Sequence, residues 1–255
     1  MAARTPDTSD SPNTAAAPQL ASVWTRPQRS RREQPALNRD QIVAEALALL
    51  DAEGFDALSM RKLGTRLGAG ATSLYTHVAN KDELLELVVD EAFGELALPT
   101  DPAPADWRAT MLELCRDIRR IMLRHSWIPV TLSSTGLVYL GPNMMRLTEA
   151  MLTILDRAGF DDESADRALN AIFAYTIGTT STEAAALASI ARSGLDEHQW
   201  LEQMMAAARV AARPYPRVFQ RYNEHIDGSP ARTREQNFEH ELELIMDGLH
   251  ARHRS

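Results

Sequence analysis

The segment from 68 to 81 collects small, hydroxyl-bearing and basic side chains, and few that could build a core. It reads GAGATSLYTHVANK. Small side chains let a backbone approach a DNA duplex closely, hydroxyls can bond to base edges and phosphates, and a helix N-terminus favours an anion. This pattern therefore favours the recognition of DNA. The residues expected to face the duplex are Ala71, Thr72, Ser73, Tyr75, His77 and Lys81.

A helix-turn-helix at about 59 to 78 would position these side chains. Ser59 can cap a short helix that Gly68 ends, and a second short helix is expected at about 70 to 77. Leu74 would hold this second helix to the core from behind. Its N-terminal end would then enter the major groove of a duplex.

Capping signals place two more helices around this motif. Asn38 and Gln41 form a capping box at the start of a helix at about 39 to 53. Asn80 and Glu83 form another, and it opens a longer helix with an apolar stripe.

The formal net charge of −8 argues at first against a nucleic-acid partner, but the charge is unevenly distributed. Residues 24 to 81 contain nine Lys and Arg against six Asp and Glu, a net of about +3, which leaves about −11 for the rest of the chain. A locally basic region in an acidic chain is compatible with DNA binding at one end and another role at the other.

The first 35 residues contain five prolines among small polar residues and arginines, which predicts a disordered arm. Its last part, RPQRSRRE at 26 to 33, is a dense cluster of arginines. This cluster is either a solvated tail or an arm that follows phosphates or enters a minor groove.

The segment LPTDPAP, 98 to 104, divides the chain into two parts. Apolar residues recur at helical spacing on both sides of it, and no alternating strand pattern is flanked by turn signals. The fold class is therefore predicted to be all-α. A three-helix, helix-turn-helix DNA-binding domain is expected at 36 to 96 and a second helical domain at 97 to 255.

Several other classes of protein are disfavoured. The sequence has no apolar run of about 18 residues and no signal peptide, so a cytoplasmic protein is expected, without a membrane partner. Cys115 is the sole cysteine, which excludes an intramolecular disulfide and a cysteine-based metal cluster, and it is interpreted as a small buried hydrophobe. An all-α enzyme is disfavoured as well, because the sequence contains no catalytic-triad order, His-Glu-x-x-His zinc motif or phosphate loop. Its histidines beyond the motif, His125 among them, are scattered without evident partners.

Residues 37 to 93 resemble the amino-terminal domain of the TetR family of transcriptional repressors. The run LYTHVANK, 74 to 81, is most similar to the subgroup that contains the tetracycline repressor. The positions that carry the resemblance are Gly54, Leu58, Arg61, Leu63, Leu67, Gly68, Leu74, Tyr75, His77, Asn80, Lys81, Leu84 and Leu85. The resemblance implies a dimeric repressor that binds a palindromic double-stranded DNA operator and is released by a ligand.

The resemblance also implies a role for each residue of the motif. Bases would be contacted by Arg61, Ala71, Thr72, Ser73 and Tyr75, and phosphates by Ser59, Lys62, Tyr75, His77 and Lys81. Where the tetracycline repressor has Gln-Pro-Thr, this chain has Ala-Thr-Ser, so a different operator sequence is expected. The alternatives are a solvated helix face for Arg61 and Lys62, and packing at a helix end for His77.

Family members dimerise through two long helices, which correspond here to segments at about 161 to 191 and 233 to 251. In the second segment, the residues expected along the face that meets the partner are Phe238, Leu242, Ile245 and Leu249. The alternative is that this face belongs to a core helix within one chain.

The resemblance further implies an effector cavity in the second domain. The residues predicted to line it are Trp107, Leu114, Ile118, Met122, Met151, Phe173 and Thr176, although such residues are more often core. The positions nearest to the asparagine and first histidine with which the tetracycline repressor holds its drug and a magnesium ion carry Leu114 and Leu96. A hydrophobic small-molecule effector without a metal or cofactor is therefore expected. The hydroxyls between Thr176 and Thr182 could orient such a ligand, bond back to their own helix or face the partner.

Two functional alternatives stay open at this point. One is a TetR-like regulator without a small-molecule effector, and the other is an activator instead of a repressor.

Overall fold

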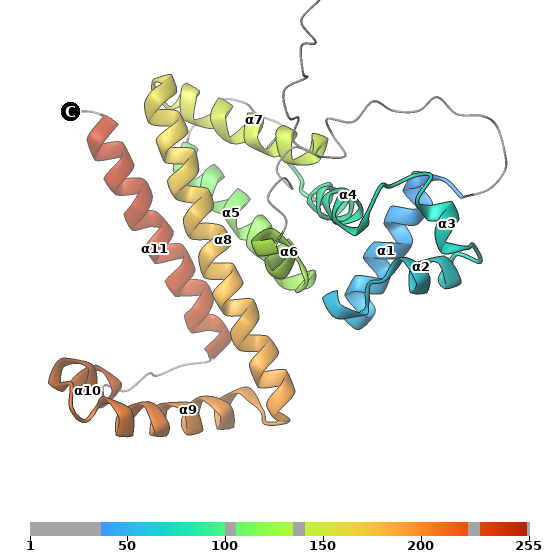
Figure 1. The fold of residues 1–255 in the computed structure, drawn as a ribbon. Helices are drawn as coiled ribbons and strands as arrows, with labels where there is room; N and C mark the ends of the chain where they lie inside the picture. The colour runs from blue at the N-terminus through green and yellow to red at the C-terminus, as the bar shows by residue number, and fades with distance from the viewer. Residues whose placement is uncertain (1–36, 100–105, 135–140, 224–229, 254–255) are drawn as a thin grey trace, which may run out of the picture.

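The computed structural model describes residues 37–99, 106–134, 141–223 and 230–253, and in these residues all regular structure is helical (Figure 1). The helices are α1 (Arg39–Glu53), the 3-10 turn η1 (Phe55–Ala57), α2 (Met60–Arg66), α3 (Ala71–Leu74), α4 (Lys81–Phe93), α5 (Trp107–Arg124), α6 (Ile128–Ser134), α7 (Pro142–Arg157), α8 (Asp162–Ser193), α9 (Glu197–Ala212), α10 (Pro216–Asn223) and α11 (Pro230–His253). The all-α prediction is confirmed. The predicted arm at 1–35 and most of the break at 98–104 lie outside the described residues.

Local capping starts the first helices where the sequence predicts. Asn38 Oδ1 accepts from the backbone N–H of Gln41 at 2.7 Å, and the Gln41 side chain accepts from the N–H of Asn38 at 3.0 Å, so the capping box of α1 is confirmed. The box predicted for α4 is only half formed. Asn80 accepts from the N–H of Glu83, but the Glu83 carboxylate accepts from the N–H of Ala79 at 2.9 Å instead of from the N–H of Asn80.

The second helix of the motif is shorter than the predicted span of 70 to 77. α3 ends at Leu74, and the chain continues through tighter turns to Val78. Both the N–H and the hydroxyl of Thr76 donate to the carbonyl of Ser73, at 3.3 and 2.7 Å, and this three-residue bonding replaces the α-helical pattern.

α4 joins the helix-turn-helix to the rest of the molecule. Every side chain of α4 from Glu83 to Asp90 is buried, since the helix packs against α1 on one side and against α5, α6 and α7 on the other (Figure 1). One continuous hydrophobic core therefore runs from Ile42 in α1 to Met246 in α11.

α8 and α11 lie side by side, and both pack on α5 (Figure 1). The apolar face of α11 predicted to meet a partner is largely turned inward instead. Phe238 and Leu242 are fully buried within the chain, and Phe238 stacks on Tyr175 of α8 with ring centroids 5.6 Å apart. For these two residues the prediction of a dimer face is wrong, because α5 and α8 supply an apolar surface that α11 covers within one subunit.

α9 begins near the C-terminal end of α8 and leads away from it, and α10 packs beside α9 (Figure 1). Neither of these helices, nor α6, was predicted individually from the sequence. Within the described residues, no helix combines the length and apolar character needed to cross a membrane, and no group of three or more potential metal ligands comes together.

Candidate nucleic-acid interface

The close crossing of α2 and α3 depends on two glycines. The N–H of Ala69 donates to the carbonyl of Gly64 at 2.8 Å, and a Cβ at Gly64 would lie only 2.7 Å from the carbonyl oxygen of Ala69. Gly68 has a φ of +65°, a conformation that glycine adopts without strain. Gly64 was not identified from the sequence, although a glycine inside a helix often marks such a close approach.

The motif is held from behind by a small apolar layer. Leu63 of α2, Leu74 of α3 and Val78 after α3 have no exposed surface. With the apolar side of α3 buried in this way, Thr72 and Ser73 are exposed to solvent. Tyr75, which follows α3, is half exposed. An uncharged, hydroxyl-rich edge is therefore presented to solvent.

The other residues predicted to contact DNA lie around this edge. Ser59 and Arg61 are exposed, whereas Ala71 and His77 are half-buried. The hydroxyl of Ser59 already accepts from the backbone N–H of Lys62 at 3.2 Å as the cap of α2, so its structural role is filled. These positions fit the predicted contacts, and the contacts themselves stay predictions.

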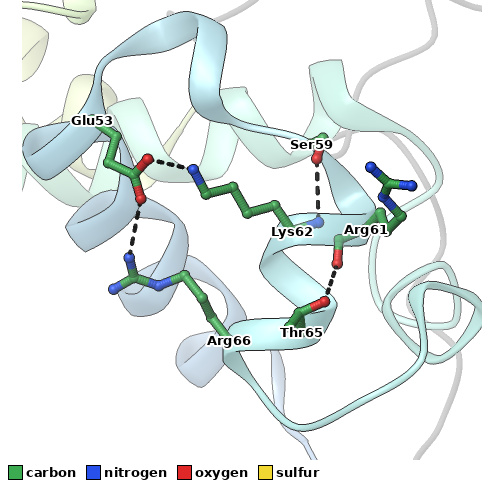
Figure 2. Close-up of a pocket in the computed structure, with 6 residues that line it drawn as sticks. All are labelled: Glu53, Ser59, Arg61, Lys62, Thr65 and Arg66. Atoms are coloured by element: carbon green, nitrogen blue, oxygen red, sulfur yellow. Dashed lines mark hydrogen bonds and ion pairs between the residues drawn. The ribbon is translucent and has the colours of Figure 1, made fainter.

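The cations of α2 are not equally available (Figure 2). Lys62 Nζ donates to Glu53 at the end of α1, and Arg66 pairs with Glu45 and approaches Glu53 Oε1 to 3.7 Å. Arg61 points away from these carboxylates, and its guanidinium has no hydrogen bond or ion pair with any residue that the structure describes. An open hollow of about 500 Å³ lies over this side of α2, lined by Glu53, Ser59, Arg61, Lys62, Thr65 and Arg66.

Lys81 lies at the first turn of α4, next to the helix-turn-helix. Its ammonium group is 4.6 Å from the ring centroid of Phe55, over the face of that ring. A cation–π contact of this kind holds the charge near the start of α4 without neutralising it.

The predicted effector residues lie in the core around α5, α7 and α8. Leu114, Ile118, Met122, Met151 and Thr176 are buried, and Trp107 and Phe173 pack against the same core at its edge. Burial raises the pKa of the neighbouring Cys115 thiol to about 12, so this cysteine stays neutral, as expected of a small hydrophobe. Burial of this kind suits both a core and a cavity wall, so the pocket stays a prediction.

Three of the hydroxyls predicted to orient a ligand are engaged within α8, whereas the buried hydroxyl of Thr176 has no hydrogen-bond partner among the described residues. The side chains of Thr180, Ser181 and Thr182 donate to the carbonyls of Thr176, Ile177 and Gly178, at 2.6, 2.7 and 3.0 Å. For these three residues the alternative of bonding back to the helix is confirmed.

Two polar junctions that were not predicted from the sequence tie α1 and α4 to α5–α7. Asp51 of α1 accepts from Trp127 Nε1 at 2.7 Å, and its Oδ1 lies 2.7 Å from Nδ1 of the buried His125. His125, which looked partnerless in the sequence, therefore has a partner 74 residues away. No local sequence pattern predicts a contact between residues so far apart in the chain.

The second junction is Asp90 of α4, which caps α7. Its carboxylate accepts from the backbone N–H groups of Asn143 and Met144 at 3.0 Å. Burial raises the pKa of Asp90 above its ordinary value, and these hydrogen bonds offset part of the shift. Gly141 is required here, because a Cβ would lie 2.1 Å from Asp90 Oδ1.

Both parts of the chain match known protein families. Residues 42–88 match the family described as "Bacterial regulatory proteins, tetR family", and residues 98–253 match "Tetracyclin repressor-like, C-terminal domain". The HTH-type transcriptional repressor DrrR1 of Streptomyces coeruleorubidus is 31% identical over 235 residues, which cover 90% of this chain and 84% of DrrR1.

Two solved structures resemble the chain in fold and sequence. The TetR family protein ActR of Streptomyces coelicolor in complex with actinorhodin has a TM-score of 0.70 and 32% identity, covering 84% of this chain and 97% of ActR. BioQ in complex with its double-stranded DNA operator has a TM-score of 0.53 and 30% identity, covering 58% of this chain and 88% of BioQ.

Proposed function

Because this chain belongs to the tetR family of bacterial regulatory proteins, we propose that it is a dimeric repressor of transcription that a hydrophobic small molecule releases from a palindromic DNA operator. The observation that carries this proposal is the helix-turn-helix, which buried apolar residues hold from behind and whose outward edge is polar and exposed. A regulator of this type carries out no chemical reaction.

On DNA, the N-terminal end of α3 enters the major groove. Thr72, Ser73 and Tyr75 face base edges beside Ala71, and Arg61 reaches a base from α2. Phosphates are bound by Ser59, Lys62, His77 and Lys81 on either side of the groove, again with Tyr75. Their exposed or half-exposed placement around α3 supports this division between base contacts and phosphate contacts.

Dimerisation uses the outward faces of α8 and α11. Ala174, Gly178 and Ala185 are exposed along α8, and Leu244, 58% exposed, lies with Gly248 on the outer side of α11. Small residues let helices of two subunits approach closely, and an exposed leucine gains from burial. These positions replace Phe238 and Leu242 as the expected contact face.

The effector occupies the region around α5, α7 and α8. Its wall is mostly apolar, which favours a hydrophobic or aromatic molecule with few charges. The likeness to ActR, which was solved in complex with actinorhodin, supports a small-molecule effector for this chain.

Release follows from the connection through α4. A ligand that shifts α5 or α7 also shifts Asp51 and Asp90, and with them the spacing of the two recognition helices. A tenfold release needs about 1.4 kcal/mol of ligand preference for the shape that does not fit DNA, and operator DNA then weakens ligand binding by the same factor.

The test starts from duplexes selected out of a random library by the purified full chain. We expect a two-fold symmetric site whose half-site centres lie about 34 to 36 Å apart, seen as two protected patches in footprinting. Selected duplexes without two-fold symmetry would contradict the proposal. A thermal-shift screen of apolar compounds, followed by release from the selected duplex, separates it from a regulator without an effector, and reporter expression separates repression from activation.

A further inference from the structure

Two of the three cations on α2 are held by carboxylates of α1. Lys62 donates to Glu53, and Arg66 pairs with Glu45 and approaches Glu53 as well, while Arg61 points away from this cluster (Figure 2). We propose that Glu53 is an intramolecular competitor of the DNA backbone, whose carboxylate holds Lys62 in the way that a phosphate does in the complex. This inference rests on the proposed DNA-binding function.

The chemistry of the two partners is the same. A carboxylate and a backbone phosphate both offer anionic oxygens to an ammonium group, whose compact charge is largely met by one close anion. The side chains of Lys62 and Glu53 are 40% and 41% exposed, so their ion pair opens at modest cost. On approach to a duplex, the phosphate has to replace Glu53 at Lys62.

The placement of Glu53 explains why the pair exists. Glu53 is the last residue of α1, where the free backbone carbonyls already make the helix end negative, and the last turn of α1 contains no basic residue. Lys62 and Arg66 therefore supply the positive charge that this helix end lacks. The same ion pairs stabilise α2 against α1 and reduce the number of cations that are free for DNA.

The consequence differs for the two kinds of contact. Arg61, the predicted base contact of α2, is available at once, whereas Lys62, the predicted phosphate contact, has to exchange partners. Glu53 thus weakens the attraction that does not depend on sequence. An exposed ion pair corresponds to a factor of about 1.5 to 5 in an equilibrium constant, and two DNA-binding domains multiply it to about 2- to 25-fold.

The experiment uses the full chain and a fluorescent duplex of mixed, non-palindromic sequence, with affinity measured by anisotropy over a range of NaCl concentrations. Glu53→Gln should raise the affinity by about 2- to 25-fold and steepen the slope of log affinity against log salt by up to about one for each DNA-binding domain. Glu53→Asp keeps the charge but shortens the reach, so it should show part of this gain.

Lys62→Gln is the matched control, because it breaks the same ion pair from the other side. Both Gln variants should lose little thermal stability, with a slightly larger loss for Glu53→Gln because Arg66 also approaches Glu53, yet Lys62→Gln should bind more weakly and with a shallower slope. Glu91→Gln removes one negative charge from an exposed position on α4, outside the cluster, and should change both values little.

The outcomes separate the inference from the function on which it rests. If Glu53→Gln bound like Glu91→Gln, or lost affinity together with Lys62→Gln, Glu53 would be only a structural partner, and the inference alone would fail. If neither the wild-type chain nor any variant bound a duplex, the proposed function would fail and the inference with it.

Discussion

The two regions proposed to bind partners are built in opposite ways. At the helix-turn-helix, Thr72 and Ser73 are exposed and polar, and the buried Leu74 holds them from behind. In the effector half, the region around α5, α7 and α8 that is proposed to bind the effector, Ile118 and Met122 are themselves part of the buried core. Binding and stability can therefore be changed separately in the first region, whereas in the second region a change in the wall of a ligand site is also a change in the core.

The largest expected effect tests this contrast directly. Ile118→Ala should lower the free energy of unfolding by about 2 to 5 kcal/mol, because Ile118 is fully buried and its loss leaves a cavity. Thr72→Ala, at an exposed position, should stay within about 0.5 kcal/mol. Urea denaturation measures both. A loss below about 1 kcal/mol for Ile118→Ala would mean that the side chain borders an existing void, and the contrast would break down.

The features that could be predicted from the sequence depend on contacts between residues that are close in the chain. Asn38, Ser59 and Gly68 act through neighbours within a few residues, so the start of α1 and the frame of the helix-turn-helix were predicted correctly. Leu74 was recognised as the inner face of α3 from spacing alone. Short-range signals are sufficient wherever the contact itself is short-range.

Contacts between residues far apart in the chain could not be predicted, because they depend on how the helices pack against one another. The apolar spacing of α11 identifies a buried face, but it does not say whether that face meets the same chain or a partner, and Phe238 and Leu242 meet the same chain. The pairing of Glu53 with Lys62, and of Asp51 with His125, depends on how helices cross in space. No spacing along the sequence encodes those crossings.

A second prediction fills the effector half instead of emptying it. If Leu114 and Phe173 border a cavity, Leu114→Trp and Phe173→Trp should leave stability and DNA binding intact but abolish release by the effector. If they are core, each should cost about 1 to 3 kcal/mol through overpacking. Thermal denaturation and a release assay on the selected duplex distinguish the two results. Unchanged release together with unchanged stability would place the effector elsewhere.

A third prediction sharpens the DNA side. Arg61→Ala should weaken binding to the selected duplex by about 1 to 3 kcal/mol and relax the preference at one base pair, because a base contact carries sequence information. The free energy of unfolding should hardly change, since Arg61 is exposed. Binding to a panel of single-base variants of the duplex provides the measurement. A uniform loss across the panel would instead identify Arg61 as a phosphate contact.

A smaller effect is expected for Lys81. Lys81→Ala should weaken binding to all duplexes alike and lower the salt slope by about one, because a phosphate contact carries no sequence information. Phe55→Leu removes the aromatic face under the ammonium group but keeps its charge, and it serves as the control. Anisotropy titrations at several salt concentrations would show a loss of sequence preference if the roles of Lys81 and Arg61 were exchanged.

The smallest expected effect concerns Asp90, which lies at the boundary between the two regions and combines a polar group with burial. The pKa of Asp90 is raised above its ordinary value of 3.8 because burial penalises the charged carboxylate more than the hydrogen bonds from α7 favour it. The folded chain therefore holds this proton more tightly than the unfolded chain does. The contribution of Asp90 to stability is greatest below pH 3.8 and is lost as the pH rises through the raised value.

Asp90→Asn should remove this dependence while keeping an oxygen that can accept from the N–H groups of Asn143 and Met144. Urea unfolding of both proteins at several pH values from about 3.5 to 7 should show the variant gaining stability relative to the wild type as the pH rises, with no further change once Asp90 is ionised in both states. The opposite slope would mean that the N-terminus of α7 favours the charge by more than burial penalises it. In that case the ionised carboxylate of Asp90, as the cap of α7, would stabilise the junction between α4 and α7.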